Sequence, residues 1–128
     1  MKNLAGWLMA VNATIFFFGA VQHAAVTIGP FHEPRILAAA IVETVCGVSL
    51  LYGAVALFRN WKRSWGTAVI ANSISLSGVL LGIAALAVGA GPRTASNDLY
   101  HRMMLVLIAA AYVILFWQRL RVDAAPKK

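Results

Sequence analysis

Four long apolar runs constrain what this chain can fold into. They cover residues 4–27, 36–58, 66–90 and 99–118. Each run is close to the roughly 20 residues that an α-helix needs to cross a bilayer. None shows the sustained alternation of a β-strand, and a bilayer accommodates only helices and closed barrels. Prolines and glycines fall in the connections, where helices end. We therefore predict one all-α domain, residues 1–128, with four transmembrane helices.

Composition supports an integral membrane protein. Of the residues, 61% are hydrophobic and 12% are charged, and the mean hydropathy is +0.77, whereas a soluble domain is about 45–50% apolar and about 25% charged. The formal charge of +7 does not indicate nucleic-acid binding, because the basic residues lie at the ends of apolar runs rather than in a groove. The sequence contains no phosphate-binding glycine loop, nucleophile elbow or HExxH motif, so it gives no positive indication of an enzyme.

Lysine and arginine are distributed unequally between the two sides of the predicted bundle. Eight lie on one side: Lys2, Arg59, Lys62, Arg63, Arg119, Arg121, Lys127 and Lys128. Three lie on the other: Arg35, Arg93 and Arg102. The positive-inside rule then places both termini and the middle connection in the cytoplasm. The four tryptophans fall at the same boundary, where an indole is favoured.

Short connections predict that consecutive helices pack antiparallel, as an up-down-up-down bundle. In the third run, Gly78 and Gly82 form a GxxxG pattern, which lets helix backbones approach closely in lipid. Asn12 and Asn72 both lie roughly two turns from the cytoplasmic side, so we expect a hydrogen bond between the first and third helices. We interpret all four as packing residues.

Glu43 is a carboxylate inside the second apolar run, where insertion costs about 2.5–3.5 kcal/mol, so it requires a partner or a function. Depth, counted at about 1.5 Å per residue, brings His23 and His101 close to it on the outer side. Further polar groups occupy the outer connections and helix ends. The binding candidates are therefore Glu43, His23, His101, His32, Glu33 and Arg35.

Three interpretations of these residues stay open. In a structural one, Glu43 pairs with His23 or His101, or is kept protonated by burial. In a second, the acid and imidazoles hold a quinone headgroup or another small amphiphile, or exchange a proton with it. In a third they bind a metal ion or haem, with His23 and His101 as the first ligand candidates, although HxxxH, HxH and ExxH spacings are absent. Cys46 is better explained by packing than by chemistry.

Residues 19–57 read GAVQHAAVTIGPFHEPRILAAAIVETVCGVSLLYGAVAL. A small residue and a histidine end the first run, a short proline-bearing connection follows, and a second run holds glutamate and glycine. This segment resembles the DoxX-like four-helix membrane proteins, although here Gly47 follows Glu43 rather than a glycine preceding the acid. The resemblance implies a small bacterial inner-membrane protein, from a family with some members in quinone-linked redox systems, and carries over no catalytic residue.

We predict an accessory or small-ligand (quinone-like) binding subunit of a larger membrane assembly, such as a redox complex, in the bacterial cytoplasmic membrane. A quinone or a haem is compatible with the candidate residues, and neither is required. The expected partners are the lipid bilayer and other membrane subunits or a second copy, with no nucleic acid. One alternative is a small proton-coupled transporter in which Glu43 carries the proton. Another is a purely structural subunit that assembles through Gly78 and Gly82.

Overall fold

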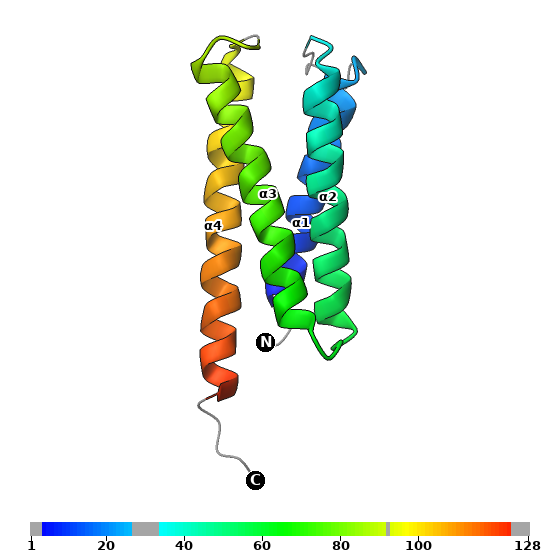
Figure 1. The fold of residues 1–128 in the computed structure, drawn as a ribbon, viewed down its shortest axis with the longest axis vertical. Coiled ribbons are helices and arrows are strands. Elements are labelled where there is room, and N and C mark those ends of the chain that lie inside the picture. Colours follow the sequence, from blue (N-terminus) through cyan, green and yellow to red (C-terminus); the bar gives the residue numbers. More distant parts are fainter. Residues whose placement is uncertain (1–3, 27–33, 92, 124–128) are drawn as a thin grey trace.

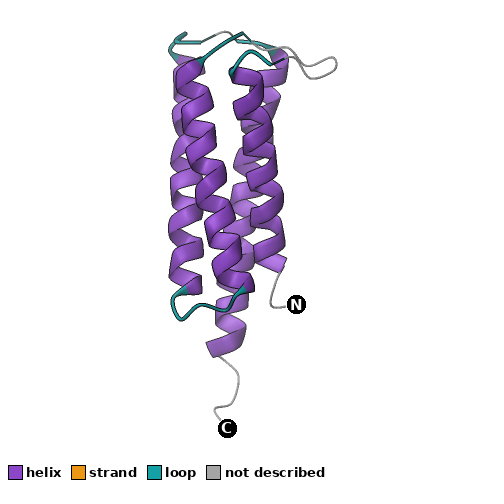
Figure 2. Cartoon of the chain, turned by 90° about the vertical axis from the view of Figure 1, so that its right-hand side faces the viewer, coloured by secondary structure: helices purple, strands orange, loops and turns teal. Residues whose placement is uncertain are grey.

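The chain folds into a four-helix bundle. The computed structural model describes residues 4–26, 34–91 and 93–123. Its helices are α1 (Leu4–His23), α2 (Leu37–Phe58), α3 (Ser64–Ala87) and α4 (Ala95–Asp123). Contacts join α1 to α2, α2 to α3, α3 to α4 and α1 to α4, so α1 and α3 stand diagonally across the bundle (Figures 1 and 2). The predicted all-helical bundle is confirmed.

The two ends of the bundle differ in their side chains. Successive helices run in opposite directions, so α1 begins at the end where α4 finishes (Figure 1). We call this the basic end, because it carries Arg59, Lys62, Arg63, Arg119 and Arg121. We call the opposite one, where α1 finishes and α4 begins, the histidine end, because it holds His23 and His101.

Three helices end with one residue in the left-handed region. These residues are Ala25 (φ 73°), Asn60 (φ 50°) and Gly89 (φ 74°). In each case the following N–H group bonds the carbonyl five residues earlier, as in Trp61 to Ala56 at 3.1 Å, which is the pattern of a Schellman cap. This cap stops α3 at Ala87, before the end of the predicted run at about residue 90.

Helix α4 starts earlier and ends later than the predicted 99–118. The Thr94 hydroxyl accepts a hydrogen bond from the Asn97 N–H at 3.1 Å, so it caps the helix and allows α4 to begin at Ala95. Asp98 falls in the first turn, where a carboxylate is favoured by the helix dipole. The helix therefore extends beyond the predicted apolar run at both ends.

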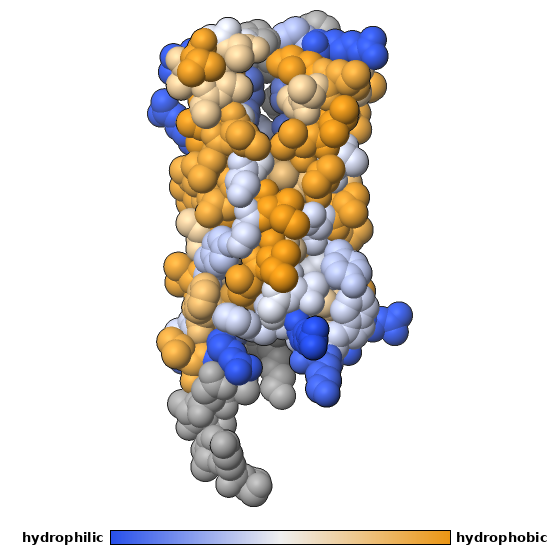
Figure 3. Space-filling view, viewed as in Figure 1, coloured by the Kyte–Doolittle hydropathy of each residue, from blue (hydrophilic) through white to orange (hydrophobic). Residues whose placement is uncertain are grey.

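All four helices are long and apolar enough to span a membrane. Large apolar side chains point outward along their length, among them Val113 at 69% exposure, Leu81 at 64% and Val106 at 66%. Apolar surface covers most of the middle of the molecule, and charged groups gather toward its ends (Figure 3). A soluble monomer rarely exposes a continuous apolar surface of this extent.

The interior changes character along the bundle axis. Near the basic end, the buried residues are apolar or small, among them Ala5, Met9, Ala54, Ala68 and Leu115. The buried polar side chains of the described residues lie at mid-length or toward the histidine end: Asn12, His23, Glu43, Asn72, Ser75, Asn97 and His101. The buried histidines and the buried carboxyl group of the described residues therefore all lie in the histidine half of the bundle.

Candidate functional site

The centre of the candidate site is a buried pair formed by His23 and Glu43. Nδ1 of His23 lies 2.8 Å from Oε2 of Glu43, and the two side chains are only 5% and 7% exposed. The contact joins the last residue of α1 to the second turn of α2. The sequence left His23 and His101 as possible partners of Glu43, and in the structure the partner is His23. This bond offsets part of the cost of burying the carboxyl group.

Backbone geometry holds His23 in place from a second direction. Its carbonyl accepts a hydrogen bond at 2.9 Å from the N–H group of Ile36, which directly precedes α2. The left-handed cap at Ala25 ends α1 and turns the chain away immediately after this histidine. The start of α2 is thus tied to the end of α1 by one backbone bond and one side-chain bond, and both bonds involve His23.

Tyr100 of α4 contributes a third polar group, which the sequence did not single out. A Cβ atom placed on Gly19 would lie 2.8 Å from both Oε1 of Glu43 and the hydroxyl oxygen of Tyr100. Glycine at this position therefore lets α1 approach a carboxylate from α2 and a phenol from α4. The Tyr100 hydroxyl is buried and makes no close hydrogen bond to a described residue, and it interacts with the Glu43 carboxyl group. An interfacial tyrosine is common in membrane helices, so nothing in the pattern marked it.

His101 belongs to the same end of the bundle but makes different contacts. Its Nδ1 donates a hydrogen bond to the carbonyl of Asn97 at 2.9 Å, and its ring lies directly against Gly82 of α3. The ring also meets that of Tyr100 edge to face, with centroids 5.3 Å apart. His101 therefore supports the tyrosine rather than hydrogen-bonding to the carboxylate.

The other candidates for the outer site do not join this group. Arg35 is described and exposed, and His32 and Glu33 lie outside the described residues. Within residues 4–26, 34–91 and 93–123, no group of three or more His, Cys, Asp or Glu is placed to hold a metal ion. The described side chains consequently offer a carboxyl–imidazole pair and a phenol, which suit hydrogen bonding to a small polar group.

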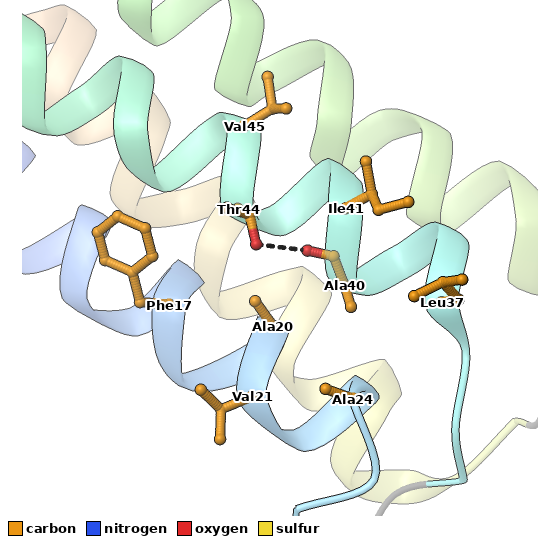
Figure 4. A pocket seen from close by; sticks show the side chains of 9 residues that line it. All are labelled: Phe17, Ala20, Val21, Ala24, Leu37, Ala40, Ile41, Thr44 and Val45. Carbon is orange, nitrogen blue, oxygen red and sulfur yellow. Dashed lines mark hydrogen bonds between the residues drawn. The ribbon is translucent and has the colours of Figure 1, made fainter.

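A shallow groove of about 480 Å³ lies beside the α1–α2 contact near the histidine end (Figure 4). Of its nine lining residues, only Thr44 carries a polar side chain, and the Thr44 hydroxyl donates to the carbonyl of Ala40 at 2.7 Å. Ala20 and Ala40 line the groove, and each precedes a member of the buried pair by about one helical turn. Polar site and apolar groove therefore border the same short stretch of α1 and α2.

Of the four predicted packing residues, the two glycines lie at helix contacts, whereas the two asparagines do not bond each other. Gly78 contacts Cys46 of α2, and Gly82 contacts His101 of α4, so the GxxxG pattern admits two different helices rather than one. Asn12 and Asn72 are both completely buried, but the hydrogen bond expected between them does not form. Asn72 instead donates from Nδ2 to the carbonyl of Ala68 in its own helix at 3.0 Å, and both polar side-chain atoms of Asn12 lack a hydrogen-bond partner among the described residues.

Comparison of the chain with protein-family models, with curated proteins and with solved structures finds no match. Functional inference consequently rests on the residues of this chain. The DoxX-like resemblance of residues 19–57 stays a prediction from the sequence.

Proposed function

We propose that this chain is a multi-pass protein of a bacterial cytoplasmic membrane that binds a small quinone-like amphiphile toward the outer face. It would act as an accessory or ligand-binding subunit of a larger membrane assembly, or as a homo-oligomer. In this proposal the basic end faces the cytoplasm, and the histidine end faces outward. The polar headgroup is held by His23, Glu43 and Tyr100.

The membrane part of the proposal is supported by the surface. Each helix meets the length and hydropathy needed for a span, and the outward side chains are mostly apolar. At the basic end, the Arg121 guanidinium stacks 3.7 Å from the ring centroid of Trp117, and Trp7 is 64% exposed. Basic and indole side chains at one boundary are favoured at the cytoplasmic face of a bilayer.

The observation that carries the ligand proposal is the buried hydroxyl of Tyr100, which lies beside the carboxyl–imidazole pair, interacts with Glu43 and makes no close hydrogen bond to a described residue. A buried donor without a partner is costly, so such groups in native structures call for an explanation. A quinone carbonyl or another small polar group can accept a hydrogen bond from this phenol. The bound group would then lie next to Glu43 and His23.

The groove fits the apolar part of the same ligand. Its lining is almost entirely aliphatic or aromatic, from Phe17 at one end to Leu37 at the other (Figure 4). Ligand sites of this kind combine a mostly apolar surface with a few polar groups that fix orientation. None of His23, Glu43 and Tyr100 lines the groove, so in this proposal the hydrocarbon tail lies in the groove and the headgroup enters the bundle beside it.

The interior of the basic half favours binding over transport. A proton pathway through the bundle requires polar groups or water along its whole length. The buried side chains near the basic end include Met9, Ala54, Ala68 and Leu115, and none of the described buried residues there is ionisable. This apolar segment leaves the polar site with access from the histidine end.

The proposal is tested by titrating the purified protein in nanodiscs with a benzoquinone that carries a decyl chain. We expect saturable binding, weakened about tenfold in Tyr100→Phe, because this variant loses the hydrogen bond to the headgroup carbonyl. Glu43→Gln should also weaken binding, because it alters the bond that orients His23 beside the headgroup. Asp98→Asn is the matched carboxylate control, since Asp98 pairs with the exposed Arg93 at the surface, and it should bind like the wild type.

The Tyr100 variant also separates a binding role from a structural one. Because its hydroxyl makes no close hydrogen bond to the described residues, Tyr100→Phe should unfold at nearly the same denaturant concentration as the wild type while its affinity for the quinone falls. Absence of saturable binding in the wild type, or equal binding by all three variants, contradicts the proposed function.

A further inference from the structure

Two amide side chains in the middle of the bundle have polar atoms without a protein partner. Asn12 of α1 and Asn72 of α3 both have 0% exposure. Oδ1 and Nδ2 of Asn12, and Oδ1 of Asn72, make no hydrogen bond to any described residue. Buried polar atoms in native proteins are nearly always hydrogen-bonded to protein or to ordered water. These three atoms therefore need partners that the neighbouring side chains do not supply.

Contacts with α2 fix the heights of the two asparagines along the bundle. Toward the basic end, Gly53 of α2 is contacted by Met9 of α1 and by Ala71 of α3. Both helices rise from that level in the same direction, since both begin at the basic end. Asn12 follows Met9 by about 4.5 Å of helical rise, and Asn72 directly follows Ala71.

A second pair of contacts marks the level above them. The ring of Phe17 in α1 lies against Gly47 of α2, and the neighbouring Cys46 lies against Gly78 of α3. The two asparagines fall between these levels at nearly the same height. Because α1 and α3 are diagonal and both amides are fully buried, the amides share one layer of the core.

Small residues from the other two helices border this layer. The Tyr112 hydroxyl lies 2.6 Å from the hydroxyl of Ser73, so it brings that part of α4 level with Asn72. Ala111, the adjacent residue, has 0% exposure. Ala111 adds little side-chain volume from α4, whereas the space beside Gly53 is occupied by Met9 and Ala71.

We propose that the layer holds ordered water that links Asn12 to Asn72. The numbers of donors and acceptors among the unpaired atoms favour water over a cation. Asn12 offers two N–H donors and one carbonyl acceptor, and Asn72 offers one carbonyl acceptor. A water molecule accepts from the Asn12 amide group and donates to the Asn72 carbonyl, so it serves both. A sodium or potassium ion would bind the two oxygens and leave the Asn12 N–H groups unpaired.

This water site does not depend on the proposed amphiphile site. It lies below Glu43, at the level where α2 places Leu50 and Gly53, and it uses none of the residues that contact the headgroup. Its role is to join helices that have few direct contacts with each other across the bundle axis.

The test uses the full chain with ¹⁵N-labelled asparagine in detergent micelles. We expect rotating-frame Overhauser cross-peaks between water and the side-chain amide protons of Asn12, assigned through Asn12→Leu. Asn60 is exposed and serves as the positive control for water contact. A cross-peak at Asn60 without one at Asn12 overturns the proposal, and so does an amide shift of Asn12 that depends on sodium or potassium concentration.

A double-mutant cycle gives an independent readout. Asn12→Leu or Asn72→Leu alone leaves the other amide without its water. Each variant should therefore lower the ratio of folded to unfolded protein by about tenfold. The double variant removes both unpaired amides and should be at least as stable as the better single variant. Strictly additive losses overturn the proposal, and if a single variant fails to fold, the wild-type cross-peak decides.

Discussion

Gly19→Ala should destabilise the bundle, although alanine is the better helix former. The added Cβ would lie 2.8 Å from Oε1 of Glu43 and from the hydroxyl oxygen of Tyr100, closer than van der Waals contact allows. Overpacking of this kind costs about 1–3 kcal/mol, and glycine-to-alanine replacement in a helix recovers about 0.5–1 kcal/mol. We therefore expect a net loss of about 1–2 kcal/mol in the free energy of unfolding.

The matched control is Gly66→Ala in α3, where an added Cβ meets no atom within 4 Å. There only the propensity gain remains, so this variant should be slightly more stable than the wild type. The assay is unfolding in mixed micelles with increasing sodium dodecyl sulfate, followed by circular dichroism. Adding Tyr100→Phe to Gly19→Ala removes one of the two close contacts and should recover part of the loss. Equal stability of Gly19→Ala and Gly66→Ala would refute the close approach of α1 to the polar site.

Two other positions give predictions in the same assay. Ala25→Gly should raise the free energy of unfolding by up to about 1 kcal/mol, because Ala25 adopts φ 73°, which is unfavourable for a residue with a Cβ atom. Ala109→Gly, on the exposed side of α4, should lower it by a similar amount, and a stability loss in Ala25→Gly would contradict the cap. Tyr112→Phe should cost about 0.6–1.7 kcal/mol through loss of its bond to Ser73, whereas Tyr52→Phe, at an exposed position, should cost nothing measurable.

The helices were predictable because hydrophobic run length alone decides whether a segment can cross a bilayer. The first and last residues of the helices were harder to predict from the sequence. Thr94 starts α4 through a hydroxyl cap, so the polar residues after it belong to the helix although they lie outside the apolar run. Gly89 ends α3 within the apolar run, because a left-handed residue terminates a helix regardless of hydropathy.

The polar site was predictable in depth but not in direction. Counting residues places His23, His101 and Glu43 at similar depths, yet it cannot say which side of each helix faces which neighbour. That orientation decides that His23 bonds Glu43, while His101 bonds its own helix at Asn97. Tyr100 joins the site only because glycine at position 19 allows the close approach of three helices, which is a property of the packed bundle.

The same distinction applies to the asparagines. Asn12 and Asn72 were expected at one level, and the contacts around Gly53 agree with that level. The predicted bond between them fails because the Asn72 amide has a nearer acceptor at Ala68, one turn earlier in α3. Competition from a local carbonyl is available to every asparagine within a helix.

The central claim is that the His23–Glu43–Tyr100 site binds an amphiphile, and photo-crosslinking tests it most directly. A benzoquinone with a photoreactive headgroup and a decyl tail is irradiated with the membrane-embedded protein, and the labelled residues are located by mass spectrometry. We predict labelling in the peptides around Gly19–His23, Glu43 and Tyr100, which excess unlabelled quinone abolishes. Labelling confined to the basic end, or labelling that excess quinone does not reduce, would contradict the claim.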